Sequence, residues 1–216
     1  VKKLICASNS NNVLTDFLQT GVYDRNRKFY ETISPSMDIL VSSNLERLLF
    51  DMTNSDDRKI TSWMRELSRT GRYDAGYCLD KIKELFWGGY CDDTETKHEI
   101  KRVFETEHYL CDTHTAVAAG VYNKYVENSG DDKTPAIIVS TASPYKFSAD
   151  VLDAVSGGKY GDLRGFDAVR RLSELTCTDV PMPILGLENK PVRFSSTCRK
   201  EEMNGEVLKF ADGRFV

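Results

Sequence analysis

The chain has 216 residues, of which 40% are hydrophobic and 29% are charged, and its formal net charge is −4. This length suits one large domain or two small ones, and the composition is that of an ordinary globular protein. The weak negative charge gives no general attraction to nucleic acid or anionic membranes, and no apolar run approaches the roughly 18 residues of a membrane-spanning helix, so we expect neither partner.

The six cysteines are scattered and form no C-x-x-C pair, which argues against a zinc site and against a disulfide scaffold. We expect reduced thiols in a cytoplasmic protein, no bound metal and no catalytic cysteine. The first residues contain too short an apolar stretch for a signal peptide. The chain begins with Val1 rather than methionine, which suggests a piece of a longer protein.

In chain order, residues 3–8 form a short apolar run that predicts a buried strand. A polar turn at 9–12 follows, and the apolar residues of 13–18 then recur with helical spacing. Gly21 is placed to end that helix.

Amphipathic patterns predict helices at 45–52, 57–70 and 79–86, and Gly88-Gly89 then breaks the chain. These patterns favour a helical insertion over 44–90 rather than part of an alternating sheet.

The next segment reads helix, strand, helix. Helices are predicted at 94–107 and from Asp112 onward, and another at 147–155. Between them, the nearly continuous apolar run 135–140 is typical of a central parallel strand. This order predicts a parallel α/β sheet with crossover connections.

The tail differs, with helical patterns at 162–175 and 201–210 separated by Pro181, Pro183 and Pro191, which indicate an extended wrap. We therefore predict four parts: a strand and helix at 1–20, a mainly helical insertion at 21–92, an α/β part at 93–158 and a C-terminal helical wrap at 159–216.

Two segments are candidates for a small-molecule site. Loop 140–144 follows the predicted central strand, where open parallel sheets bind ligands, although its hydroxyls could simply cap a turn. Residues 112–115 open a helix whose N-terminus favours anions and hydrogen-bonding groups. The alternative is a simple N-cap made by Asp112 or Thr113, with His114 half-exposed.

Two further segments carry a weaker signal. The glycine-rich loop 156–162 could nest a phosphate, but it does not match the P-loop pattern and suits a surface loop better. Asn44 and Arg47 could face one ligand from a first helical turn, with Arg47 binding phosphate or carboxylate in a bidentate manner. The alternative is an Asn cap and a surface ion pair with Glu46 or Asp51.

Beyond these local signals, five segments in order resemble motifs of the threonine synthase family. The turn 3–14 resembles its "ATNxND" segment, and 34–47 resembles "SPSMDIxxxSNxER". Likewise, 112–117 resembles "DPHTAV", 140–147 resembles "STAHPAKF", and 191–203 resembles the C-terminal segment. Thr113 stands where the family often has Pro, and Ser143 stands where many members have His.

The resemblance implies the C-terminal part of a type II pyridoxal-phosphate fold, a parallel sheet with flanking helices and a helical insertion. The Schiff-base lysine and the glycine-rich cofactor-phosphate loop are then expected upstream, so no residue here, Lys146 included, is assigned the catalytic amine. The implied partner is the missing N-terminal half of the same enzyme. By itself the chain is expected to be inactive and not to bind pyridoxal 5′-phosphate.

The implied activity of the whole enzyme is the conversion of O-phosphohomoserine and water to threonine and phosphate. The resemblance suggests Thr141 on the cofactor's pyridine nitrogen, with Asn9, Asp112 and His114 lining the cofactor pocket. Asn44 and Arg47 are the expected substrate-side residues. The alternatives are another type II lyase, such as a threonine or serine deaminase, and a non-enzymatic interaction module built from the helical insertion.

Overall fold

The computed structural model describes residues 1–193 and 195–213. They divide into a first unit, Val1–Val180, and a second that starts at Pro181. The buried hydrophobic residues all come from the first unit.

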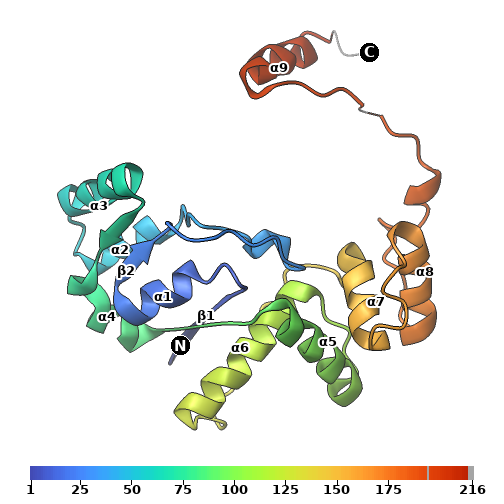
Figure 1. The fold of residues 1–216 in the computed structure, drawn as a ribbon, viewed down its shortest axis with the longest axis horizontal. Helices are drawn as coiled ribbons and strands as arrows, with labels where there is room; N and C mark the ends of the chain where they lie inside the picture. The colour runs from blue at the N-terminus through green and yellow to red at the C-terminus, as the bar shows by residue number, and fades with distance from the viewer. Residues whose placement is uncertain (194, 214–216) are drawn as a thin grey trace. The chain divides into compact units, whose positions relative to one another are not determined.

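The sheet of the first unit is a parallel pair of strands (Figure 1). Strands β1 (Leu4–Ser8) and β4 (Phe86–Tyr90) pair over all five residues of each. Helices α1 (Val13–Thr20) and α6 (Thr113–Ser129) pack on them. The strand predicted at residues 3–8 is confirmed, but it is not the buried strand expected, because Leu4 is 40% exposed and Ser8 is its one buried residue. The helix that ends at Gly21 is also confirmed.

The chain break predicted at Gly88-Gly89 is wrong, because both glycines lie inside β4. A Cβ added at Gly88 would lie 3.0 Å from the side chain of Leu18 on α1, and one added at Gly89 would lie 3.1 Å from Val121 on α6. Successive strand residues face opposite sides of a sheet, so the two helices cover opposite faces of β4. The glycines allow both helices to approach closely, and β4 belongs to the sheet rather than to a helical insertion.

Between α1 and β4, the chain forms the three helices that the sequence predicts. They are α2 (Leu45–Met52), α3 (Asp57–Thr70) and α4 (Leu79–Leu85). The Asp56 side chain caps α3 by accepting a backbone N–H of its first turn, and Gly71 ends the helix at a left-handed φ of 76°.

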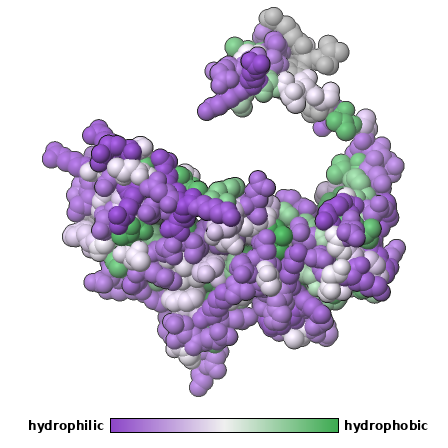
Figure 2. Space-filling model, in the orientation of Figure 1, coloured by the Kyte–Doolittle hydropathy of each residue, from purple (hydrophilic) through white to green (hydrophobic). Residues whose placement is uncertain are grey.

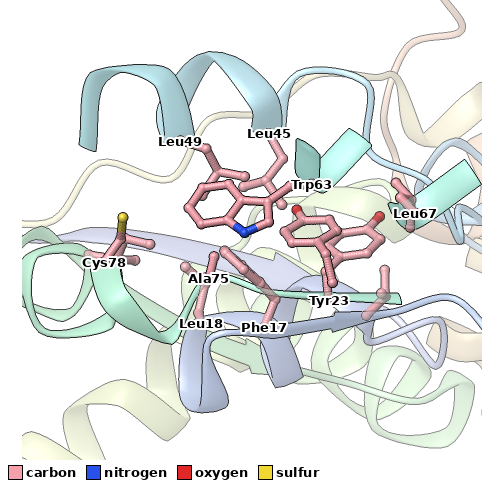
Figure 3. Packing of buried hydrophobic residues seen from close by; sticks show 12 residues of the cluster. Phe17, Leu18, Tyr23, Leu45, Leu49, Trp63, Leu67, Ala75 and Cys78 are labelled. Carbon is pink, nitrogen blue, oxygen red and sulfur yellow. The ribbon is translucent and has the colours of Figure 1, made fainter. Parts of the chain in front are cut away.

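These helices enclose an aromatic core with a short antiparallel ribbon, β2 (Val22–Asp24) and β3 (Arg72–Asp74). The rings of Tyr23 and Tyr73 stack with centroids 5.2 Å apart, and Trp63 stacks on Tyr73 at 6.0 Å. Figure 3 shows Tyr23 and Trp63 among the side chains of this core. Each such pair contributes roughly 0.5–1.5 kcal/mol beyond the area it buries. Because Tyr23 and Leu45 both belong to this core, it holds both ends of the segment between β2 and α2.

The remaining helices of the first unit form a packed layer. Helix α5 (Asp93–Glu107) contacts α6 and α7 (Ser148–Ser156), and α7 contacts α8 (Gly165–Thr176). Asp92 and Glu95 form a capping box at the start of α5. Helix α8 thus packs in the first unit, although it falls within the segment predicted as a C-terminal wrap.

The strand predicted at 135–140 is absent from the structure. The run has no regular secondary structure, and Ile137 and Val139 are 91% and 70% exposed. A strand exists only where its backbone N–H and C=O groups pair with a neighbour. Among the described residues, no strand pairs with this run.

The second unit consists of an extended segment with short turns at η4 (Leu187–Asn189) and η5 (Lys200–Glu202), followed by helix α9 (Met203–Ala211). None of the described helices has the length and apolarity needed to span a bilayer.

On the face drawn in Figure 2, hydrophilic residues predominate and hydrophobic residues form small separate patches.

Candidate functional site

The turn after β1 carries a buried polar cluster. Asn9 and Asn11 are both almost fully buried, and each donates a side-chain hydrogen bond to Asp38 Oδ1, at 2.7 and 3.0 Å. Thr32 donates to the same carboxylate through its hydroxyl, at 2.8 Å, and through its backbone N–H, at 3.0 Å. These bonds fasten residues 30–38, which we call the strap, to the carboxyl end of β1.

A second cluster opens helix α6. The fully buried Asp112 caps the helix by accepting the backbone N–H of His114 at 2.9 Å and that of Thr115 at 3.4 Å. Asp112 Oδ1 also lies 3.0 Å from His114 Nδ1. The Thr115 hydroxyl also donates to Asp112 Oδ2, so two backbone N–H groups and the side chains of His114 and Thr115, all from the first helical turn, satisfy the buried carboxylate.

His114 connects this helix to the strap. Its Nε2 accepts the backbone N–H of Ser36 at 3.1 Å. A backbone N–H can only donate, so Nε2 carries no proton and the proton of the neutral ring lies on Nδ1, facing Asp112. Both ring nitrogens are thus engaged, and His114 offers a bound molecule its ring face rather than a hydrogen bond.

The loop that begins at Ser140 contacts the start of helix α6. Thr115 Oγ1 and Ser140 Oγ lie 3.2 Å apart; because the Thr115 proton is donated to Asp112, Ser140 is the donor of this pair, and its own oxygen accepts the hydroxyl of Tyr109 at 3.4 Å. Ser143, which stands where a His is frequent in the family, accepts the backbone N–H of Tyr145 at 3.3 Å and so caps the next turn. The four motif segments of the first unit therefore meet at one end of β1.

That meeting point closes one end of an apolar groove of about 710 Å³. One wall is β1, which pairs with β4 along its other edge and with no strand on this side within the described residues. The run 135–139 also lines the groove, as do Tyr122 and Tyr125 of α6. At its polar end lie Ser36, Met37, His114 and Thr141.

The predicted cofactor residues thus divide into two kinds. Thr141 and His114 line the groove. Asn9 and Asp112 are buried, and their side chains form hydrogen bonds to neighbouring protein groups. Sequence reasoning missed Asn11, Thr32 and Asp38. No local pattern marks them, because Asn11 and Asp38 lie 27 residues apart in the sequence and only the fold brings them together.

Asn44 and Arg47 do not line this groove. Both are exposed at the start of α2, where Arg47 borders a separate shallow hollow of about 390 Å³ that Asp51 and Asp57 also line. The surface ion pair considered for Arg47 is absent from the described residues. The assignment of both residues to the substrate stays a prediction.

Two lysines line the groove, at the end away from the strap, and both ammonium groups are engaged. Lys2 Nζ lies 2.6 Å from the Asp131 carboxylate, and the hydrogen bond to that group raises the pKa of Lys2. Lys3 Nζ donates to the carbonyl oxygens of Lys83 and Glu84, each at 2.9 Å. Lys146 is exposed on the turn before α7.

The buried thiols are unsuited to nucleophilic work. Burial raises the pKa of Cys111 to about 12 and that of Cys91 to about 11, so both stay protonated near neutral pH. This agrees with the interpretation of these two cysteines as small buried hydrophobes.

The fold and the groove define a class: part of an α/β protein with an apolar groove whose polar end lies at the carboxyl end of a parallel strand. Residues 115–203 match the family model "Threonine synthase, C-terminal". Human "Threonine synthase-like 1" is 42% identical over 158 residues, which is 72% of this chain and 21% of that protein. Threonine synthase of Saccharomyces cerevisiae is 34% identical over 171 residues, 73% of this chain and 33% of the yeast protein.

Two solved structures extend the comparison to the fold. The crystal structure of yeast threonine synthase matches with a TM-score of 0.79 and 28% identity, covering 98% of this chain and 42% of that one. A pyridoxal-phosphate-bound threonine synthase from Brucella melitensis matches with a TM-score of 0.67 and 32% identity, covering 79% and 36%. In sequence and in fold, the chain matches the C-terminal part of threonine synthases. It spans less than half of the length of these relatives.

Proposed function

We propose that this chain is the C-terminal part of a pyridoxal-phosphate-dependent threonine synthase that converts O-phosphohomoserine and water to threonine and phosphate. The observation that carries the proposal is the meeting of four motif segments at one end of the groove, although they span residues 9 to 141 of the chain. Ligands of open α/β sheets bind at the carboxyl ends of the strands, and this meeting point lies at the carboxyl end of β1.

The residues present fit part of the cofactor. Thr141 is exposed at the polar end of an otherwise apolar groove, and its hydroxyl makes no hydrogen bond within the described part of the chain. In this proposal Thr141 holds the pyridine nitrogen, while the apolar walls keep water away from the ring. When bound, the cofactor supplies an electron-withdrawing ring that acidifies hydrogens of the attached substrate.

The covalent lysine and the cofactor-phosphate loop are assigned to the part of the longer relatives that this chain does not match. The engaged ammonium groups of Lys2 and Lys3 support this assignment, because an amine that attacks a carbonyl must be free of such partners.

The groove also supports a partner for this chain. β1 leaves one row of backbone groups without a partner strand, and the apolar run 135–139 lines the same groove, also without a partner strand among the described residues. In this proposal a strand that enters the groove pairs with the free edge of β1 and with the run. We assign that strand to the N-terminal part of the family, and it would turn run 135–140 into the central strand predicted from the sequence.

Without that strand, the chain should be marginally stable or self-associating, because an open apolar edge pairs readily with other chains. Sedimentation velocity should show oligomers that the double variant Ile137→Lys/Val139→Lys reduces, since charges on an edge oppose pairing. Val192→Lys, an equally exposed apolar site in the second unit, is the control and should change nothing. A sharply melting, strictly monomeric chain would contradict the open-edge proposal.

The activity itself is tested by product analysis. A longer protein in which this chain follows the N-terminal part of the family should form threonine and inorganic phosphate from O-phosphohomoserine in equal amounts. A deaminase would instead release ammonia and a 2-oxo acid from threonine or serine. The second outcome, with no threonine formed, would replace the proposed function by the deaminase alternative.

A further inference from the structure

The strap is held at two points by side chains that belong to other segments. At its base, the Asp38 carboxylate gathers Asn9, Asn11 and Thr32, and the Asn11 side chain pairs with both backbone groups of Tyr30 at 2.8 and 3.0 Å. Near its turn, His114 accepts the Ser36 N–H. The two anchors come from the β1 turn and from the start of α6, so they fix the strap relative to both.

The geometry at His114 is specific to one orientation of the ring. Asp112 Oδ1 lies 3.0 Å from Nδ1, which fixes the proton there and leaves the Nε2 lone pair for Ser36. The ring of Phe147 lies beside the imidazole, with centroids 4.7 Å apart, and limits its rotation. The imidazole thus connects the helix cap to the strap.

The bond from His114 holds the backbone of Ser36 and leaves its side chain available. Ser36 is exposed and lines the groove, and its hydroxyl has no hydrogen-bond partner among the described residues. Ser36 lies at the same polar end of the groove as Thr141. Of the strap residues that line the groove, Ser36 and Met37, it alone brings a polar side chain.

We propose that Asp38 and His114 are positioning residues that hold the strap, and that Ser36 is the strap residue that contacts the bound substrate. The hydroxyl would donate to an anionic oxygen, a carboxylate or a phosphate, of the amino-acid substrate. This rests on the proposed function. The side chain that forms a hydrogen bond to a ligand from this part of the groove is then Ser36, rather than His114 or Asn9.

The positioning part is tested by amide hydrogen exchange on this chain without cofactor, so its outcome does not depend on the proposed activity. His114→Asn keeps a donor near Asp112 but loses the acceptor at Nε2, whereas His114→Gln can place an oxygen where Nε2 stood. Exchange of the Ser36 amide should rise about five- to tenfold in His114→Asn and much less in His114→Gln. His98→Gln, an exposed histidine on α5, is the matched control.

Asp38→Asn is the second variant. Both carboxylate oxygens of Asp38 accept hydrogen bonds, so in either orientation the NH₂ group of an asparagine would face a donor and lose that bond. The Thr32 amide should then exchange about five- to tenfold faster, with Asp57→Asn on the exposed start of α3 as control. Amides of the β2–β3 ribbon report global unfolding and should not change. Unaltered exchange at Ser36 in His114→Asn and at Thr32 in Asp38→Asn would overturn the positioning role.

The substrate contact is tested in the longer, cofactor-loaded protein. Ser36→Ala should raise KM for O-phosphohomoserine about tenfold and leave the Kd for pyridoxal 5′-phosphate unchanged, while Ser68→Ala on the exposed face of α3 changes neither. An altered Kd for the cofactor with an unchanged KM would overturn the assignment to substrate in favour of a cofactor contact. Parental values of both would show that Ser36 contacts neither.

Discussion

Purified as the 216-residue chain, this protein should turn over no O-phosphohomoserine, even with excess pyridoxal 5′-phosphate. Covalent cofactor chemistry needs a free amine beside the bound ring. The lysines that line the groove are tied to Asp131 and to backbone carbonyls, and Lys146 is exposed on a turn. The expected effect is complete loss of catalysis, not a partial reduction.

The measurement is threonine formation by mass spectrometry together with phosphate release. The positive control is the yeast enzyme under the same conditions, and the negative control is a heat-denatured sample of this chain. Threonine that accumulates in proportion to the amount of chain added would contradict the prediction, and it would place a functional amine among residues 1–216.

Local patterns predicted most helices because each is decided within a few turns. Helix α3 begins and ends where the spacing of Ile60, Trp63 and Leu67 and the stop at Gly71 place it. Strand β4 was missed for a tertiary reason: its glycines resemble a chain break, yet they serve the close approach of α1 and α6. A single-residue pattern cannot distinguish these two uses of glycine.

The apolar run 135–140 failed in the opposite way. Its sequence favours a strand, but a strand also needs a neighbour, and the described part of the chain supplies none. The apolar pattern thus indicates that the segment is suited to a buried strand, but not that the described chain provides a partner for it. In the site, Thr141 could be predicted from its place after this run, whereas the Asp38 cluster depends on contacts between segments more than twenty residues apart and left no local signal.

In the longer protein, Thr141→Asp should lower kcat/KM about a hundredfold or more while leaving stability nearly unchanged. Thr141 is exposed and its hydroxyl bonds no described residue, so folding does not depend on it. A neutral hydroxyl can donate to an unprotonated ring nitrogen, whereas a carboxylate favours the protonated ring through charge pairing. That changes how strongly the ring withdraws electrons, and loss of one such interaction in a catalytic site typically costs about 10²–10³ in rate.

Two companion variants separate the hydroxyl from the charge. Thr141→Ala removes the donor and should cost about 1–3 kcal/mol of transition-state stabilisation, through an unsatisfied partner, while Thr141→Ser keeps the donor and should stay near the parent. Thr61→Asp, on the exposed face of α3, controls for added charge. The test is steady-state kinetics, cofactor absorbance and thermal melting of all four variants. If Thr141→Asp and Thr141→Ala both keep parental turnover and absorbance, Thr141 is a turn residue only, and the cofactor ring lies elsewhere in the groove.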